Sequence, residues 1–266
     1  MKITIFTGRS SRHKFLIKIL KQHELHVISE EKNSYSYLKS TSFKKNNVEK
    51  NYFNKVKNSE KKIFGKLRLR KTDFKKILKL KYQYINKTKF SKFKSFLKSD
   101  IYIVFGSSII KGELLKFLIK KKCINIHMGI SPYYRGSNCN FWAIIDKKYN
   151  FVGSTIHYLS PNVDQGQILY HAITEPVANP FDFSMAAVKS AIISIANNIK
   201  NNQIFDFKPN KQNLKKQIRL SKNSDIDSRA IKKYPNKIMF KNYNKNLLIN
   251  PFVLKKRNIY AKNFKI

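Results

Sequence analysis

The first 28 residues constrain the fold more than any other stretch of the chain. Residues 1–7 (MKITIFT) alternate and favour β-structure, and Gly8 ends them. Residues 13–23 (HKFLIKILKQH) carry apolar side chains at helical spacing, and residues 25–28 form a second short apolar run. A strand, a helix and a strand at this spacing predict a parallel βαβ unit, and therefore an α/β protein. No glycine-rich loop follows the first strand, so a dinucleotide site or a P-loop is not indicated.

The central part of the chain, from residue 101 to residue 199, predicts a further series of regular elements. It predicts strands at 101–106, 123–128, 152–159 and 167–175, and helices at 112–121, 140–146 and 181–198. The last two of these strands are close enough in the chain to form a hairpin-like pair. We expect a mostly parallel sheet flanked by helices, in a catalytic domain over residues 1–204.

The two flanks of this central part are strongly basic. The whole chain of 266 residues has a formal net charge of +40, but residues 101–199 carry only 9 basic and 5 acidic groups. The excess lies in a basic insert over residues 30–98 and in a small basic C-terminal extension over residues 205–266. Within the insert, residues 74–85 and 90–98 predict amphipathic helices.

The ratio of Lys to Arg indicates whether the positive charge serves to bind nucleic acid. Of the 55 basic residues only 8 are Arg, whereas proteins that read phosphates and bases usually depend on the planar fork of Arg. The charge therefore favours solvated lysine faces over a dedicated nucleic-acid surface. Lysines interleaved with aromatic residues over 41–98 keep a nucleic-acid-binding protein open as an alternative.

Other classes of protein are disfavoured by composition. No apolar run approaches the roughly 20 residues that span a bilayer, and the first residues resemble a strand more than a signal peptide. The two cysteines, Cys123 and Cys139, fit a reducing compartment and have no metal-ligand spacing. We therefore expect a cytoplasmic protein that needs no membrane and no metal.

Residues with chemical potential follow the strand at 123–128. Asn125 and His127 are two apart, so their side chains share one face near the carboxyl end of the sheet, where open α/β sheets place ligands. A longer pattern continues from this pair. It comprises Pro132, Arg135-Gly136, Trp142, Gly153, Thr155, His157, Asp164 and Gly166.

This pattern resembles the folate-dependent formyltransferase family over residues 101–175. The family has an Asn-x-His strand, a Pro and Arg-Gly loop, a Gly-x-Thr/Ser-x-His strand, and an Asp-x-Gly seven residues later. The resemblance implies a Rossmann-like, mostly parallel sheet and transfer of a formyl group from 10-formyltetrahydrofolate to an amine. It places the catalytic roles on Asn125, His127 and Asp164, with Thr155 in support.

The chemistry of formyl transfer suits these residue types. A reaction through a tetrahedral intermediate needs a donor aimed at the developing oxyanion, which the amide of Asn125 can supply. It also needs a group that handles the amine proton near neutral pH, a role suited to His127. We expect the carboxylate of Asp164 to orient the His127 ring and to raise its pKa.

The resemblance also implies how the substrates bind. Ser108, Ile109, Ile110 and Val163 would line the pterin pocket. Arg135 and Gly136 would shape the loop beside the acceptor. His157 is interpreted as a support residue.

The identity of the acceptor is left open by the sequence. The turn after the first strand lacks the Gly-Thr-Pro of the methionyl-tRNA enzymes, and only about 60 residues follow residue 205, which is short for their C-terminal barrel. An amino-sugar nucleotide is therefore favoured over methionyl-tRNA. A non-catalytic nucleic-acid-binding protein on the same fold is the alternative from another class.

Overall fold

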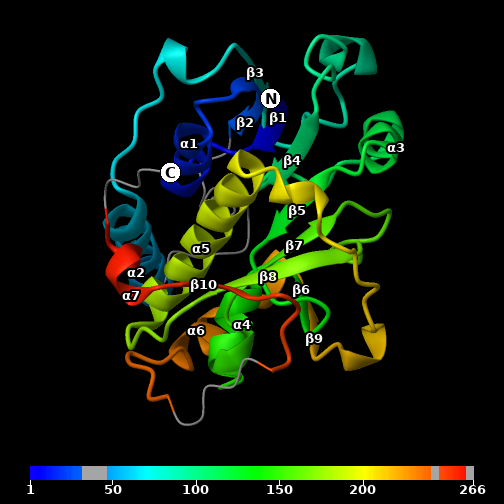
Figure 1. Cartoon of the computed structure of the whole chain (residues 1–266). Helices are drawn as coiled ribbons and strands as arrows, with labels where there is room; N and C mark the ends of the chain where they lie inside the picture. The colour runs from blue at the N-terminus through cyan, green and yellow to red at the C-terminus, as the bar shows by residue number, and fades with distance from the viewer. Residues whose placement is uncertain (32–46, 241–245, 262–266) are drawn as a thin grey trace.

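The computed structural model describes residues 1–31, 47–240 and 246–261, and its centre is an eight-stranded sheet (Figure 1). The strand order is β10-β8-β7-β5-β4-β1-β2-β3. The strands of this sheet are β1 (Lys2–Thr7), β2 (Glu24–Glu31), β3 (Lys76–Lys81), β4 (Ile101–Phe105), β5 (Ile124–His127), β7 (Ser154–Tyr158), β8 (Ile168–Thr174) and β10 (Phe252–Leu254). A second sheet pairs β6 (Tyr134–Gly136) with β9 (Arg219–Ser221).

Pairing in the main sheet is parallel except around β7. That strand runs antiparallel to both β5 and β8, and its pairing with β8 is the hairpin-like pair that the sequence predicted. Strands β5, β4, β1, β2 and β3 are parallel throughout. The structure confirms the predicted α/β class with a mostly parallel, Rossmann-like sheet.

The sheet is covered on both faces, which explains why its strands are apolar on both sides. Successive side chains of a strand point to opposite faces. Ile3 and Ile5 of β1 belong to one apolar cluster and Phe6 belongs to the other. Likewise, Ile103 of β4 belongs to the first cluster and Val104 to the second.

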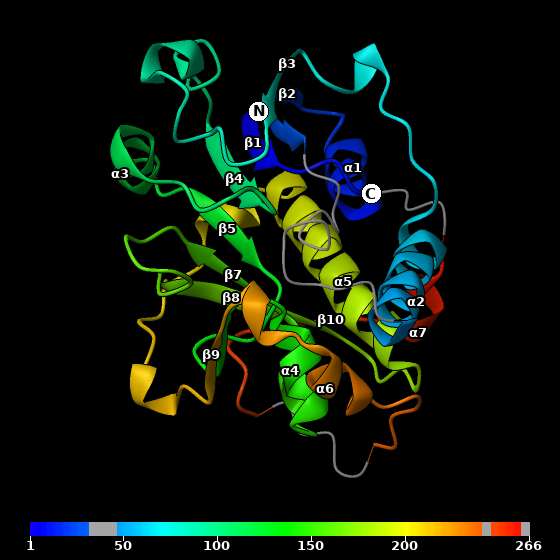
Figure 2. The same cartoon turned by 180° about the vertical axis from the view of Figure 1, so that it is seen from behind.

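Figures 1 and 2 show the long helix α5 lying across one face of the sheet, with α1 and α2 beside it. Helix α3 lies on the other side of the strands, where Leu114 and Leu118 join the second cluster. The helices are α1 (Ser11–Ile19), α2 (Asn47–Phe64), α3 (Gly112–Lys120), α4 (Cys139–Ile145), α5 (Pro180–Lys200), α6 (Ser228–Lys232) and α7 (Lys256–Ile259). No helix among the described residues is both long and apolar enough to cross a membrane.

The prediction of two amphipathic helices in the basic insert was wrong. Residues 76–81 form the edge strand β3, parallel to β2, because pairing with a buried strand outweighs helical spacing in so short a run. Residues 90–93 form only a 3₁₀ turn, and Phe93 and Phe96 anchor this region in the second cluster. Exposed lysines on β3 protect the free edge of the sheet from further pairing.

The C-terminal residues pair and pack with earlier parts of the chain. Strand β9 pairs with β6, and β10 extends the main sheet beside β8. Ile226, Ile238 and Ile259 are buried in the first cluster. A boundary at residue 204 and an insert over 30–98 stay predictions, and residues 32–46 of that insert lie outside the described residues.

One buried ammonium group, that of Lys189, connects helices α2, α5 and α7. Lys189 of α5 is fully buried, and its Nζ donates to the backbone oxygens of Ile63 (3.2 Å), Ile259 (2.8 Å) and Ala261 (2.8 Å). Burial lowers the pKa of Lys189 to about 8. The ammonium binds carbonyl groups that end α2 and α7, so it holds both helices against α5.

We expect Lys189→Met to destabilise the fold. The substitution leaves three backbone carbonyl groups without this donor, two of them buried, which costs about 2 kcal/mol in free energy of unfolding. Urea denaturation measures the change, and Lys200→Met at the exposed end of α5 is the matched control. Equal stability of the Lys189 variant and the wild type would show that the three contacts contribute nothing net.

Candidate active site

Two predicted site residues lie on β5 and point to the same side of the sheet. Asn125 and His127 are separated by the buried Ile126, so strand alternation alone puts them on one face. The side chain of His127 is 6% exposed, and that of Asn125 is half-buried. Both line a cavity of about 390 Å³ at the carboxyl ends of β1, β4 and β5.

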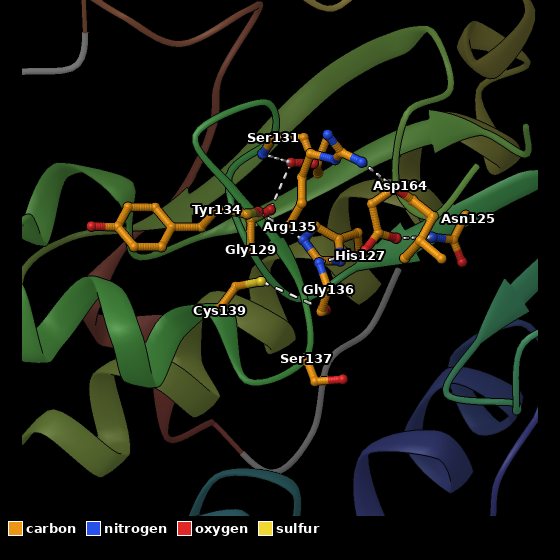
Figure 3. A network of polar contacts seen from close by, with 12 residues as sticks. Asn125, His127, Gly129, Ser131, Tyr134, Arg135, Gly136, Ser137, Cys139 and Asp164 are labelled. Atoms are coloured by element: carbon orange, nitrogen blue, oxygen red, sulfur yellow. Dashed lines mark hydrogen bonds and ion pairs between the residues drawn. The ribbon is translucent and has the colours of Figure 1, made fainter. Parts of the chain in front are cut away.

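Asp164 reaches the same point from the loop between β7 and β8 (Figure 3). Its Oδ2 accepts a hydrogen bond from the backbone N–H of Gly136 at 3.0 Å and lies 3.3 Å from Nδ1 of His127. The backbone of Asp164 is in the left-handed region, with φ of 51°. A Cβ on Gly166 would lie 1.6 Å from the carbonyl oxygen of Tyr158, so the tight return of this loop requires a glycine there.

Both ring nitrogens of His127 face hydrogen-bond acceptors. The carbonyl oxygen of Tyr134, 3.1 Å from Nε2, can only accept, so Nε2 carries a hydrogen. The neutral ring then presents the lone pair of Nδ1 to the carboxylate of Asp164. A proton taken up at Nδ1 completes an ion pair with Asp164, so this nitrogen is placed to receive one.

Burial and charge act in opposite directions on this pair. Burial lowers the pKa of His127 below its ordinary value, and the charge of Asp164 opposes that shift only in part. The predicted rise in this pKa was therefore wrong in net direction, because burial outweighs the carboxylate. Burial raises the pKa of Asp164, but the charge of His127, the neighbouring His157 ring and the Gly136 N–H outweigh burial and hold that pKa well below its usual range.

His157 fixes the orientation of the Asn125 amide. Nδ1 of His157 lies 2.8 Å from the carbonyl oxygen of Tyr158, so it is a donor and Nε2 is left as an acceptor. Nδ2 of Asn125 lies 3.0 Å from that Nε2 and donates to it, and it makes a longer contact of 3.4 Å with Oδ1 of Asp164. His157 does not line the cavity, and its role as a support residue stays a prediction.

Thr155 shapes the loop that follows β5. It lies opposite His127 in the β5–β7 pairing and is fully buried. Its hydroxyl donates to the carbonyl oxygen of Gly129 at 2.6 Å and accepts the N–H of Ser131 at 2.9 Å. The side chain therefore acts on the loop after His127 and does not line the cavity.

Arg135 and Gly136 connect this loop to the Asp164 loop. The guanidinium of Arg135 donates to the carbonyl oxygen of Val163 at 2.9 Å and to Oε1 of Gln217 at 2.6 Å. Gly136 supplies the N–H that the Asp164 carboxylate accepts. Of the two, only Gly136 lines the cavity.

Sequence reasoning missed one residue that holds the Asp164 loop. Nε2 of Gln212 donates to the backbone oxygens of Asp164 (2.9 Å) and Gly166 (2.7 Å), and its side chain is 9% exposed. It comes from the polar C-terminal segment, where no pattern distinguishes it from the surrounding Asn, Gln and Lys residues. The contact of Gln212 with the Asp164 loop depends on the tertiary fold, so it could not be predicted from the sequence.

The four predicted pterin-pocket residues divide into two pairs. Ile109 is 61% exposed, Val163 is 42% exposed, and both line the cavity beside Asp164. Ile110 is buried in the second apolar cluster instead. The hydroxyl of Ser108 donates to the carboxylate of Glu30 at 2.7 Å, so it holds the loop after β4 against β2 and does not line the cavity.

We expect Asp164→Asn to lower the pKa of His127 further. The carboxylate favours the charged form of the ring, so its removal leaves burial less opposed. Titration of the histidine resonances by NMR measures the change, with the half-buried His23 as an internal control. A His127 resonance that titrates at the same pH in both proteins would contradict the assigned geometry.

Comparison with known proteins gives the chain its relatives. A family model described as Formyl transferase matches residues 1–180. A GDP-perosamine N-formyltransferase of Brucella melitensis is 40% identical over 62 residues, 23% of this chain and 23% of that protein. A methionyl-tRNA formyltransferase of Desulforamulus reducens is 36% identical over 69 residues, 26% of this chain and 21% of that protein. The chain thus spans about a quarter of the length of the curated relatives it matches.

Solved structures share the fold over most of the chain. A 4-N formyltransferase from Francisella tularensis matches with a TM-score of 0.55 and 19% identity over 88% of this chain and 86% of that one. An N-formyltransferase from Helicobacter canadensis, described in complex with folinic acid and dTDP-3-aminofucose, matches with a TM-score of 0.50 and 18% identity over 85% and 72%. The structural likeness shows the fold, and the family model covers well over half of the sequence. This chain belongs to the formyl transferase family.

Proposed function

We propose that this protein transfers a formyl group from 10-formyltetrahydrofolate to a primary amine. The observation that carries the proposal is the meeting of Asn125, His127 and Asp164 at one end of a cavity of about 390 Å³. An amide donor, a proton-accepting imidazole and a buried carboxylate are the groups that acyl transfer to an amine needs.

The cavity offers a place for the folate donor. The side chains of Ile109 and Val163 present apolar surface to the cavity, which suits a flat heterocycle such as a pterin. The Helicobacter canadensis relative, described with folinic acid, supports a folate in this family. When bound, the donor supplies the formyl carbon that the amine attacks.

The residues of the chain handle charge and protons during transfer. Asn125 can exchange its longer 3.4 Å contact with Asp164 for a bond to the formyl oxygen, while His157 keeps the amide in place. His127 takes the proton of the attacking amine at Nδ1, and Asp164 then stabilises the imidazolium. The imidazolium can return this proton to N10 of the folate as the bond between the formyl carbon and N10 breaks, which releases the formylated amine and tetrahydrofolate. The lowered pKa of His127 keeps the ring neutral, and therefore a proton acceptor, near pH 7.

We favour an amino-sugar nucleotide as the acceptor. The Brucella melitensis relative acts, by its name, on GDP-perosamine, and one wall of the cavity is aromatic. This wall consists of Tyr52, Phe141, Phe181 and Tyr234. Methionyl-tRNA is the second candidate, supported by the Desulforamulus reducens relative and by the basic flanks. We also propose a cytoplasmic location, in keeping with the free thiols of Cys123 and Cys139.

Removal of the imidazole tests the proposed chemistry. We expect His127→Ala to lower kcat for formyl transfer by about 10²- to 10⁴-fold, the usual contribution of a positioned acid–base group. The assay supplies 10-formyltetrahydrofolate with GDP-perosamine, dTDP-3-aminofucose and methionyl-tRNA in turn. Absence of turnover with every acceptor, or full activity of the variant, would overturn the proposal.

Gln212 tests whether the Asp164 loop must be held in place. We expect Gln212→Leu to lower kcat about tenfold, because Asp164 is no longer held in its left-handed conformation by the two hydrogen bonds. Gln203→Leu, at an exposed position of the same segment, is the matched control. Unchanged kcat and an unchanged His127 pKa in the Gln212 variant would show that the loop holds its shape unaided.

A further inference from the structure

The loop between β4 and α3 is held in shape by side chains from other parts of the chain. Residues 107–111 form neither helix nor strand, and they lie between Gly106 and Gly112, whose φ angles are 75° and 65°. Glycine adopts these left-handed conformations readily, and it also leaves the free chain flexible. The shape of the loop therefore depends on the groups that bind its backbone.

The first of these groups is the carboxylate of Glu30, near the carboxyl end of β2. It accepts the backbone N–H of Ser108 at 2.6 Å, the Ser108 hydroxyl at 2.7 Å and the N–H of Ile85 at 3.4 Å. Glu30 is 1% exposed, so these donors replace the water that a carboxylate would otherwise bind. The carboxylate connects the loop to the turn that contains Ile85.

The second group is the side-chain amide of Asn86, in the turn after β3. Its Nδ2 donates to the carbonyl oxygen of Ile109 at 2.7 Å, and its Oδ1 accepts the N–H of Lys111 at 2.8 Å. The neighbouring Ile85 is buried in the second apolar cluster, which anchors the turn. Asn86 therefore binds the loop on both sides of Ile110, from a base that is itself fixed by packing.

Ile109 lies between these attachments, and its side chain lines the cavity beside Val163. This side chain is 61% exposed, so burial does little to hold it in place. The bonds from Glu30 and Asn86 fix the backbone immediately before and after its Cα, and they keep the side chain at the cavity wall. Tyr82, four residues before Asn86, lines the cavity as well.

We propose that Glu30 and Asn86 are positioning residues for the folate donor, because they hold residues 107–111 so that Ile109 meets the flat face of the pterin. The inference rests on the proposed formyl transfer, in which Ile109 contacts the donor. Neither Glu30 nor Asn86 lines the cavity, so their effect passes through the loop. Both fall within residues 30–98, so part of the basic insert serves the donor side of the site.

Direct binding of folinic acid, measured by isothermal titration calorimetry, tests this role without any acceptor. Asn86 is exposed, so Asn86→Ala removes both contacts with the loop and leaves the core untouched. We expect this variant to raise the Kd for folinic acid about tenfold, through the loss of two hydrogen bonds that shape the loop. Asn54→Ala, at an exposed position of α2, is the matched control.

Two substitutions of Glu30 separate its hydrogen bonds from its charge. Glu30→Gln keeps an oxygen for the Ser108 N–H, and the Ser108 hydroxyl can accept from the new amide, whereas Glu30→Leu removes every acceptor. We expect Glu30→Leu to raise the Kd for folinic acid about tenfold and Glu30→Gln to recover most of the loss. If Glu30→Leu does not fold, Asn86→Ala carries the test.

Steady-state kinetics distinguishes the donor from the acceptor. The KM for 10-formyltetrahydrofolate should rise about tenfold in Asn86→Ala, with kcat and the KM for GDP-perosamine or dTDP-3-aminofucose unchanged.

Three outcomes would overturn the inference. Equal Kd values for folinic acid in the wild type and Asn86→Ala would show that the loop needs no such support, and would leave the proposed reaction intact. Donor and acceptor KM values that rise together would indicate a general loss of shape at the site. If the wild type does not bind folinic acid, the proposed folate donor itself fails, and the role of Glu30 and Asn86 fails with it.

Discussion

The carboxylate of Asp164 is where separate parts of the chain meet. It faces Nδ1 of His127 on β5, accepts the N–H of Gly136, and touches the amide of Asn125. Its backbone is held by Gln212 from the C-terminal segment, and the neighbouring Val163 carbonyl is held by Arg135. A buried charge is tolerated only when such partners surround it, so these elements must assemble together for the site to exist.

The parallel sheet explains why the site lies where it does. The carboxyl ends of β1, β4 and β5 open onto one cavity, and the antiparallel strand β7 leads into the loop that returns Asp164 to the same place. The apolar interior on both faces keeps these strand ends fixed. Tyr52 of α2 and Tyr234, just after α6, also line the cavity, so parts of the chain outside the central motif contribute to its walls.

Strong local patterns predicted the central fold and the shared face of Asn125 and His127, whereas the approach of Asp164 to this pair was implied by the family resemblance. Alternating apolar residues and turn residues indicated the same elements in three places, so these could be predicted. They are the βαβ unit, the strand with Asn125 and His127, and the hairpin-like pair that carries Thr155. Strand β3 was misread because Lys and apolar residues in its short run fit a helix as well as an edge strand.

Other features depend on contacts between distant residues, which no local pattern records. The docking of Gln212, the ammonium of Lys189 among three carbonyl groups and the burial that lowers the pKa of His127 are of this kind. The turn of Ser108 toward Glu30 is another, since the two residues are far apart in the chain. The resemblance placed Ser108 in the pocket because motif positions carry over more readily than side-chain directions.

In the proposed reaction His127, paired with Asp164, accepts the proton of the attacking amine. The pH dependence of kcat/KM for formyl transfer, in the wild type and in Asp164→Asn, tests this role most directly. His127 must be neutral to accept a proton, so the rate should fall as pH drops through its lowered pKa. Loss of the carboxylate should move this acid limb to still lower pH. An acid limb at the same pH in both proteins, or a rate that rises as His127 becomes protonated, would contradict the account.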